Sequence, residues 1–415
     1  MAELLQSLSD SQLVARFQRR CGLYPAPPET PHEPPEGSGA PAPRPASRHT
    51  QAVNGKGGRN SAYPQPYAQK YTQKYIVKNY FYYYLFKFSA ALGEEIFYIT
   101  FLPFTHWNID PYVTRRLIII WVDLCMTIPN SRGLMLKYNI HYREVIMYIG
   151  QVSKDILKWP RPSSPPVVKL EKRLADEFGM PSTHAMAATS ISFTFLISAM
   201  DRYEYPFALG LMLAILFSTM VSLSRLYTGM HTVLDVIGGI LISGLFIAVT
   251  YPAWNLIDHL ESASLLFPIC ILVVPFFLCY NYPVSDNYTP TRADTTMILA
   301  AGAGVTIGFW VNPFFKLVSE PTESVIQSIP PLTTKMLVLG LTKFMVGIVV
   351  VFLVRQLMQN LSLQVLYSWF KVVTRNKEAR RRLEIEVPYK FVTYSSVGIC
   401  ATVFVPMLHQ FLGLL

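Results

Sequence analysis

Hydrophobic residues in this chain are gathered into long runs that recur from about residue 81 to the C-terminus. Apolar stretches of about 18 or more residues can cross the roughly 30 Å hydrocarbon core of a bilayer as helices. Such stretches are expected at Phe81–Trp107, Ala185–Met200, Pro206–Leu223, Val233–Tyr251, Ser264–Tyr280, Met297–Trp310, Met336–Leu357 and Val392–Leu412. The pattern predicts an all-α, polytopic transmembrane bundle of about 8–10 spans.

One apolar stretch is interrupted by polar residues. Ile118–Trp121 begins a helix, Pro129–Gly133 and His141–Glu144 interrupt it, and apolar character resumes over Val145–Leu157. Neither half alone is long enough to cross the bilayer. We expect either a loop between two half-spans or an insertion into one helix, and an insertion would disturb the residues that follow it.

The remaining sequence divides the chain into three regions. Residues 1–78 form an N-terminal disordered or interfacial region, because the stretch from Tyr24 to about Tyr67 is rich in Pro, Gly, Ala and Ser and has too little apolar surface to fold. Residues 79–260 form a membrane core that carries the polar motifs. Residues 261–415 supply further transmembrane helices and an interfacial helix near 361–383, which ends in the basic run Arg380–Arg382.

Composition agrees with a membrane protein. Hydrophobic residues make up 51% of the chain and charged residues only 15%, against about 25% charged residues in soluble domains. The net charge of +10 comes mostly from loops that flank apolar runs, which favours lipid headgroups or an anionic substrate over nucleic acid. The five cysteines lack the spacing of metal ligands, so we expect unpaired, buried thiols.

The first polar motif holds two cations. Lys154 and Arg161 are seven residues apart, a spacing that places them near one face of a helix. Pro160 and Pro162 should end that helix and leave Arg161 at the aqueous boundary. Two cations aimed at one point can neutralise a phosphoryl group, and the guanidinium can bind it through two parallel hydrogen bonds.

The second motif begins a predicted helix. Ser182 occupies the position of an N-cap, so the backbone N–H groups of Thr183 and His184 should be free donors at a helix N-terminus, where anions bind readily. The two predicted spans that follow form a hairpin. An even number of crossings returns the chain to the membrane face on which it started, so the third motif should lie beside the second.

The third motif combines a cation with a histidine and a carboxylate. Arg225 could bind phosphate oxygens, and His231 and Asp235 are four residues apart, hence neighbours if both lie on one helix. A carboxylate that accepts from one imidazole nitrogen leaves the other nitrogen nucleophilic. His184 could then protonate the leaving alkoxide as a general acid.

Each of these residues alone also fits a structural role. His184 could be a satisfied polar residue at a helix start, His231 and Asp235 a structural pair, Arg225 an interfacial side chain, and Lys154 part of a solvated helix end. Three independent accidents in this order and spacing are a poor explanation. The three motifs together favour a single phosphate-handling site at a membrane surface.

The three motifs resemble those of the type 2 phosphatidic acid phosphatase superfamily. Its pattern is Lys-x6-Arg-Pro, then Pro-Ser-Gly-His, then Ser-Arg-x5-His-x3-Asp, and this chain matches it with Thr183 in place of the usual Gly. A β-branched residue there requires a helix-like turn. The Ser-Thr-His form and the flanking residues are similar to the sphingosine-1-phosphate phosphatase branch, over most of the chain from about Phe81.

The resemblance implies a phosphomonoesterase that works without a metal or other cofactor. It implies a phosphohistidine at His231, protonation by His184, orientation by Asp235, and phosphate binding by five residues: Lys154, Arg161, Ser182, Thr183 and Arg225. It also implies that the substrate is a sphingoid base 1-phosphate in the bilayer and that the product feeds ceramide synthesis, with no nucleic acid and no obligate protein partner. A broad-specificity lipid phosphate phosphatase and a catalytically silent lipid-binding protein are the alternatives.

Two observations about orientation disagree. If every candidate span crosses the membrane, Arg380–Arg382 falls on the side of the polar motifs, which suggests the cytosol. The resemblance implies a site that faces the lumen of the endoplasmic reticulum, in a multi-pass protein of that membrane. One miscounted span would reverse the first argument.

Overall fold

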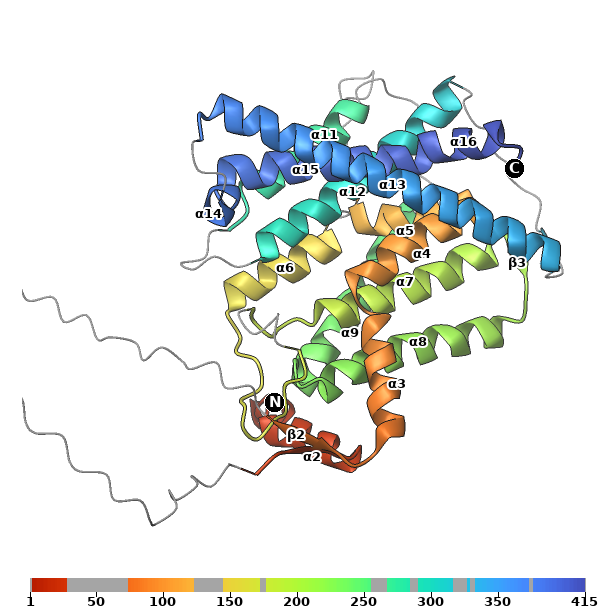
Figure 1. Cartoon of the computed structure of the whole chain (residues 1–415). Helices are drawn as coiled ribbons and strands as arrows, with labels where there is room; N and C mark the ends of the chain where they lie inside the picture. Colours follow the sequence, from red (N-terminus) through yellow and green to blue (C-terminus); the bar gives the residue numbers. More distant parts are fainter. Residues whose placement is uncertain are drawn as a thin grey trace, which may run out of the picture.

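The computed structural model describes residues 2–27, 74–122, 145–171, 177–254, 267–283, 290–315, 327–328, 333–372 and 376–414. Nearly all of this part of the chain is helical (Figure 1). The predicted disorder at 24–67 falls mainly outside the described residues, as does the interruption at 123–144.

The helices are α1 Ala2–Leu8, α2 Ser11–Arg20, α3 Tyr80–Ala91, α4 Glu95–Asn108, α5 Pro111–Val122, α6 Val145–Leu157, α7 Thr183–Met200, α8 Phe207–Tyr227, α9 Val233–Thr250, η1 Tyr251–Ala253, α11 Phe267–Tyr280, α12 Thr291–Phe315, α13 Thr334–Trp369, α14 Lys377–Arg380, α15 Leu383–Ile399, η2 Cys400–Phe404 and α16 Val405–Phe411.

Six described helical stretches are long and apolar enough to cross a membrane. They are α7, α8, α9, α12, α13 and the continuous run from α15 through η2 to α16. The other described helices of the bundle are shorter, and α11 is the apolar one among them. Most of α13 lies on the outside of the bundle, with Leu337, Leu341 and Leu353 exposed, as expected for a helix that faces lipid.

Helix α7 is the centre of the first half of the bundle. It packs against α5, α8 and α9, and small residues such as Ala185 and Ala188 are fully buried along it. At Gly239, on α9, an added Cβ would lie 2.8 Å from the carbonyl oxygen of Ser182. This close approach brings the second turn of α9 against the start of α7.

The second half of the bundle is built around the pair α12 and α15. Gly304 and Gly308 on α12 and Gly398 on α15 leave no room for a Cβ, because an added atom would overlap the backbone or side chain of the facing helix. Small residues let helix backbones approach this closely within a membrane. Farther along, the π-helix η2 frees the carbonyls of Ala401 and Thr402, which accept from Trp107 Nε1 and Asn312 Nδ2.

The first predicted span is two helices rather than one. Residues 92–94 break Phe81–Trp107 into α3 and α4. The break carries Gly93, where an added Cβ would lie 2.9 Å from Val221 Cγ1 and 3.3 Å from His184 Cδ2. The next turn falls at Asp110, whose carboxylate accepts from the Tyr112 N–H, and Arg115 and Arg116 lie within the following helix α5.

The predicted interfacial helix near 361–383 is not a separate element. Residues 361–369 continue α13, which runs for 36 residues. Arg355, near the end of the predicted apolar run, packs its guanidinium over the Tyr394 ring on α15 and donates to the Tyr394 hydroxyl. The last span starts at Leu383 rather than at Val392.

The N-terminal helix α2 is folded against the bundle. Val14 and Ala15 are buried against Val167, and the short strand β1 (Leu23–Pro25) pairs antiparallel with β2 (Tyr75–Val77) just before α3. Figure 1 shows α2 and β2 beneath the ends of α8 and α9. A second two-residue pairing, β3 (Tyr203–Glu204) with β4 (Gln327–Ser328), joins the opposite end of α7 to the segment before α13.

Candidate active site

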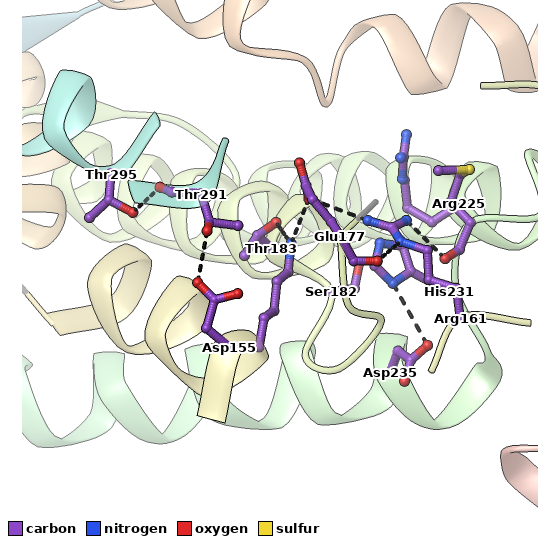
Figure 2. Close-up of polar contacts among 12 residues, drawn as sticks. Asp155, Arg161, Glu177, Ser182, Thr183, Arg225, His231, Asp235, Thr291 and Thr295 are labelled. Carbon is purple, nitrogen blue, oxygen red and sulfur yellow. Dashed lines mark hydrogen bonds and ion pairs between the residues drawn. The ribbon is translucent and has the colours of Figure 1, made fainter. Parts of the chain in front are cut away.

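The three sequence motifs meet at one end of the bundle, where α6 and α8 end and α7 and α9 begin (Figure 2). The hairpin α7–α8 returns the chain to the same end, as its even number of crossings predicted. The polar side chains there are deeply buried: Lys154 is 2% exposed, His231 1%, and Arg225 and Asp235 0%. Residues from three separate sequence motifs therefore form one cluster.

Lys154 and Arg161 converge on a shared carboxylate. The Lys154 ammonium lies 3.6 Å and the Arg161 guanidinium 3.3 Å from Glu177 Oε2. Arg161 also donates to the carbonyls of Glu177 (2.7 Å) and Met230 (3.1 Å). The two cations therefore point to one place, although not for the predicted reason: α6 ends at Leu157, so Arg161 lies in the following segment and not on the same helical face.

Arg225 is held by a second carboxylate. Its two terminal nitrogens donate to Glu171 Oε1 and Oε2 at 3.0 and 2.9 Å, in a parallel two-bond pair. The sequence prediction missed both Glu171 and Glu177. Their signal was their position in the polar loop between two cationic motifs, because cations buried in a low-dielectric site need counterions nearby.

The start of α7 has the predicted capping geometry. Ser182 is the N-cap, and its hydroxyl accepts from the Ala185 N–H at 3.5 Å. Thr183 is the first helical residue, which confirms the helix-like turn expected of a β-branched side chain, and its hydroxyl accepts from Lys154 Nζ at 3.0 Å. The first N–H groups of a helix have no intrahelical acceptors, so this end of α7 offers donors beside the cations.

His231 and Asp235 are close but are not neighbours on one helix. His231 lies in the turn before α9, whose N-cap is Thr232. The distance from His231 Nδ1 to Asp235 Oδ2 is 3.7 Å, longer than a hydrogen bond. Asp235 Oδ2 instead accepts from the Thr232 N–H at 2.7 Å, in a capping box. The predicted hydrogen bond between the imidazole and the carboxylate is therefore not formed, because the same carboxylate oxygen caps α9.

The surroundings of His231 favour its neutral form. Burial lowers the pKa of His231 well below its usual range, and the positive charges of Arg161, Arg225 and Lys154 lower it further. A neutral imidazole keeps a lone pair for attack on phosphorus. Its Nδ1 faces Asp235, so Nε2 is the nitrogen left for this reaction.

His184 is the second residue of α7 and is half-buried. A positive charge on His184 lowers the pKa of His231, so the two imidazoles lie close enough to interact electrostatically. Gly93 packs closely against the His184 ring, a contact that the sequence prediction missed because the first span was expected to be continuous. The break between α3 and α4 thus forms one side of the site.

Two contacts fix the site to other parts of the chain. Beside Lys154, Asp155 accepts from Tyr282 Oη at 2.8 Å and from Thr291 Oγ1 at 2.7 Å, which ties α6 to the second half of the bundle. At the other edge, Gln18 of α2 exchanges two hydrogen bonds with the backbone of Val168, at 2.7 and 2.9 Å, and donates to the Tyr227 carbonyl. The segment that leads to Glu171 is therefore anchored.

The arrangement suits the transfer of a phosphoryl group. Three cations and a helix N-terminus can bind its oxygens, and an uncharged imidazole lies among them. Among the described residues, no three His, Cys, Asp or Glu side chains come together as metal ligands. Chemistry without a metal remains a prediction from the sequence.

Comparison with known proteins shows the family to which the chain is related. Residues 144–257, which include every predicted site residue, match the family model of the PAP2 superfamily. The chain is 72% identical over 428 aligned residues to sphingosine-1-phosphate phosphatase 2 of Homo sapiens, with both chains covered completely. It is 36% identical to sphingosine-1-phosphate phosphatase 1 of Rattus norvegicus, over 81% of this chain and 74% of the relative.

More distant relatives match about half of the chain. A dihydrosphingosine 1-phosphate phosphatase of Schizosaccharomyces pombe is 29% identical over 237 residues, or 54% of this chain and 51% of its own length. No solved structure matches the chain.

Proposed function

The chain belongs to the sphingosine-1-phosphate phosphatase family of the PAP2 superfamily, and we propose that it hydrolyses long-chain sphingoid base 1-phosphates through a phosphohistidine at His231. It is a multi-pass membrane phosphatase that releases inorganic phosphate from a phosphomonoester. One observation carries the proposal: the side chains of Lys154, Arg161 and Arg225, each at most 4% exposed, converge with the buried His231 imidazole at one end of the helical bundle.

In the first step, the phosphoryl group binds among Lys154, Arg161 and Arg225, with the N–H groups at the start of α7 as further donors. His231 Nε2 attacks phosphorus, so that a P–N bond forms and the ester P–O bond breaks. His184, in its protonated form, donates its proton to the departing alkoxide, which leaves as the free sphingoid base. The cations stabilise the charge that spreads over the three non-bridging oxygens.

In the second step, neutral His184 takes a proton from water while the water oxygen attacks phosphorus. The P–N bond breaks, inorganic phosphate is released, and both histidines return to their starting forms. Asp235 stabilises the positive charge on the His231 ring during the reaction, once a small rotation closes the 3.7 Å gap to Nδ1. His231 and His184 therefore serve both half-reactions, the first as nucleophile and then leaving group, the second as acid and then base.

Substrate class follows from the relatives and from the place of the site. The relatives that cover the chain most fully are named as sphingosine-1-phosphate phosphatases. The site lies at the ends of α7, α8 and α9, all long enough to cross the membrane, so a headgroup could enter it while the lipid tail stays in the bilayer. We infer a location in the endoplasmic reticulum membrane, with the sphingosine product feeding ceramide synthesis.

The test is phosphate release from sphingosine 1-phosphate by detergent-solubilised protein in a chelator. Wild type should turn over, and His231→Ala should not. Lysophosphatidic acid, run in parallel, separates the proposed substrate class from a broad lipid phosphatase. Binding of sphingosine 1-phosphate by wild type without phosphate release would refute the proposal and favour a lipid-binding protein.

A further inference from the structure

The three phosphate-binding cations are already matched in number by carboxylates before any substrate binds. Three cationic side chains of the described residues, Lys154, Arg161 and Arg225, are matched by three carboxylates, Glu171, Glu177 and Asp235. The phosphoryl group of a monoester carries about 1.5 to 2 negative charges near neutral pH. Added to this buried cluster it leaves negative charge in excess, which is costly in a low-dielectric site. A ligand that brings its own positive charge fits better than one that does not.

The two loop glutamates are held in different ways. Glu177 has a side chain that is 6% exposed, contacts both Lys154 and Arg161, and receives a further hydrogen bond at its backbone carbonyl from Arg161. Glu171 has a side chain that is 21% exposed. Within the described part of the chain its carboxylate has one partner, the guanidinium of Arg225. Glu177 is thus a fixed counterion, and Glu171 is a carboxylate that one competing anion can release.

A phosphoryl group is that anion. Glu171 occupies the two terminal nitrogens of Arg225 with a pair of parallel hydrogen bonds, and a phosphate binds the same edge of a guanidinium in the same way. Both anions cannot use this edge at once. When the phosphate takes it, the Glu171 carboxylate loses its partner.

The released carboxylate stays near the bound phosphate. Leu170, the preceding residue, donates its N–H to the Thr228 carbonyl at 3.0 Å, just beyond the end of α8. Two residues earlier, Val168 is clamped by the side chain of Gln18. The backbone that leads to Glu171 is therefore fixed beside Arg225, and only the side chain needs to turn.

A sphingoid base 1-phosphate carries an ammonium group on the carbon next to the one that bears the phosphate. Once its phosphate lies on Arg225, this ammonium lies within a few bonds of the guanidinium and so beside Glu171. We propose that Glu171 exchanges the guanidinium of Arg225 for the substrate ammonium and thereby selects sphingoid base phosphates over amine-free lipid phosphates. This proposal rests on the function proposed above and adds a specificity-determining residue to it.

The Glu171 carboxylate has a positively charged partner both in the empty site and in the substrate complex. In the empty site Glu171 neutralises a buried cation, which would otherwise be left unpaired. In the complex it neutralises the positive charge that the substrate brings. An amine-free lipid displaces Glu171 and gives its carboxylate nothing in return, so it binds less favourably.

The experiment measures kcat and KM on four lipids: sphingosine 1-phosphate, its N-acetyl derivative, its N,N-dimethyl derivative and lysophosphatidic acid. The N-acetyl compound loses the positive charge, whereas the dimethyl compound keeps the charge and adds bulk. Wild type should prefer both charged lipids. Glu171→Gln should lower kcat/KM for the charged lipids about tenfold, mainly through KM, and should raise it for the uncharged lipids because Arg225 is no longer occupied.

Two further variants make the result independent of folding yield. Glu171→Asp keeps the charge and should retain part of the preference. Glu177→Gln should lower kcat/KM for charged and uncharged lipids alike, because it disturbs Lys154 and Arg161. The ratio between two lipids within one preparation does not depend on how much of that protein is folded.

The proposal would be overturned if Glu171→Gln kept the wild-type preference for charged over uncharged lipids. An equal rise in kcat/KM for all four lipids would also overturn it, because Glu171 would then only compete with the phosphate for Arg225. Failure of wild type to hydrolyse sphingosine 1-phosphate at all would instead refute the proposed function. The two failures are therefore distinguishable in the same set of assays.

Discussion

Helix α7 has a buried arginine–carboxylate cluster at each end, and the two clusters differ in what surrounds them. At its first turn, Arg225 and Arg161 are paired with loop glutamates beside a neutral histidine. Just beyond its last turn, Arg202 Nε donates to Asp110 Oδ2 at 3.1 Å, and Tyr203 donates to the same oxygen at 3.2 Å. Both clusters are mostly buried, yet only the first resembles an active site.

The difference lies in what closes each cluster. At the Asp110 end, aromatic rings cover the cations: Arg202 lies over the ring of Tyr112, and Arg116 lies over the rings of Tyr112 and Trp254. At the His231 end, the cations face a helix N-terminus and a partly exposed carboxylate. Buried charge by itself therefore indicates an anchor between helices as readily as a site. The site is distinguished by several cations that lie beside a histidine able to act as a nucleophile. One of their counterions, Glu171, is partly exposed and can be displaced by a competing anion.

The largest contrast should come from neutralising one arginine at each end. Arg225→Leu should lower kcat/KM for sphingosine 1-phosphate by about a thousandfold or more, because the transition state loses a two-point contact to its charged oxygens. Arg202→Leu should leave kcat/KM within about threefold of wild type, since nothing near Arg202 contacts the reacting group. Phosphate release from folded, detergent-purified protein measures both. Equal losses in the two variants would contradict the comparison.

Arg202→Leu, which should have little effect on activity, should lower the stability of the fold. Arg202→Leu leaves Asp110 buried without its ionic partner, and breaking such a pair costs about 3–5 kcal/mol. We expect the melting temperature in detergent to fall by several degrees. Replacing Asp110 as well, in Asp110→Leu with Arg202→Leu, should recover part of the loss. A double variant less stable than the single one would show that the pair is not what stabilises this end.

The pH profile sharpens the comparison at the reactive end. Because the pKa of His231 is lowered by burial and by neighbouring cations, its active neutral form persists as the pH falls below the usual imidazole range. Activity that depends on this form is lost only when the pH drops through the lowered pKa. Arg161→Gln removes one of those cations, so its acid limb should move to higher pH. The ratio of kcat/KM between variant and wild type across pH cancels the ionisation of the substrate.

An acid limb that stays in place, or that moves to lower pH, would contradict this account of the His231 environment. Arg202→Gln is the matched control. Its guanidinium is at the far end of α7, and its pH profile should coincide with that of wild type.

The smallest effect should come from the N-terminal clamp. Gln18→Ala removes the hydrogen bonds to Val168 and Tyr227 and should loosen the segment that leads to Glu171. We expect a loss of about twofold to tenfold in kcat/KM, mainly through KM, and faster proteolysis within residues 163–171. Arg16→Ala, on the exposed face of α2, is the control and should behave like wild type. A variant indistinguishable from wild type would mean that the clamp does not position the site.

The sequence predicted the membrane bundle and the residues that converge because both depend on local patterns. Apolar runs indicated α7, α8 and α9 to within a few residues, and the spacing of the motifs led to Lys154, Arg225 and His231. The capping role of Ser182 was equally local, since an N-cap depends only on the residues beside it.

Contacts between distant segments could not be predicted in this way. Glu171 and Glu177 are unremarkable in a polar loop until the fold places cations opposite them. Gln18 lies about 150 residues from its partner Val168. The end of α6 at Leu157 and the open His231–Asp235 pair also depend on competing local bonds, such as the capping of α9 by Asp235, that spacing alone does not resolve.

The central claim is that His231 carries the phosphoryl group during turnover, and the most direct test is to trap it. Protein would be mixed with sphingosine 1-phosphate labelled at phosphorus and quenched in alkali, in which a phosphohistidine survives. Wild type should carry label that acid removes, and His231→Ala should carry none. His184→Ala should also carry label, because it slows the attack of water on the phosphohistidine. Acid-labile label that persists in His231→Ala, or wild type that turns over without any label during steady state, would contradict the account.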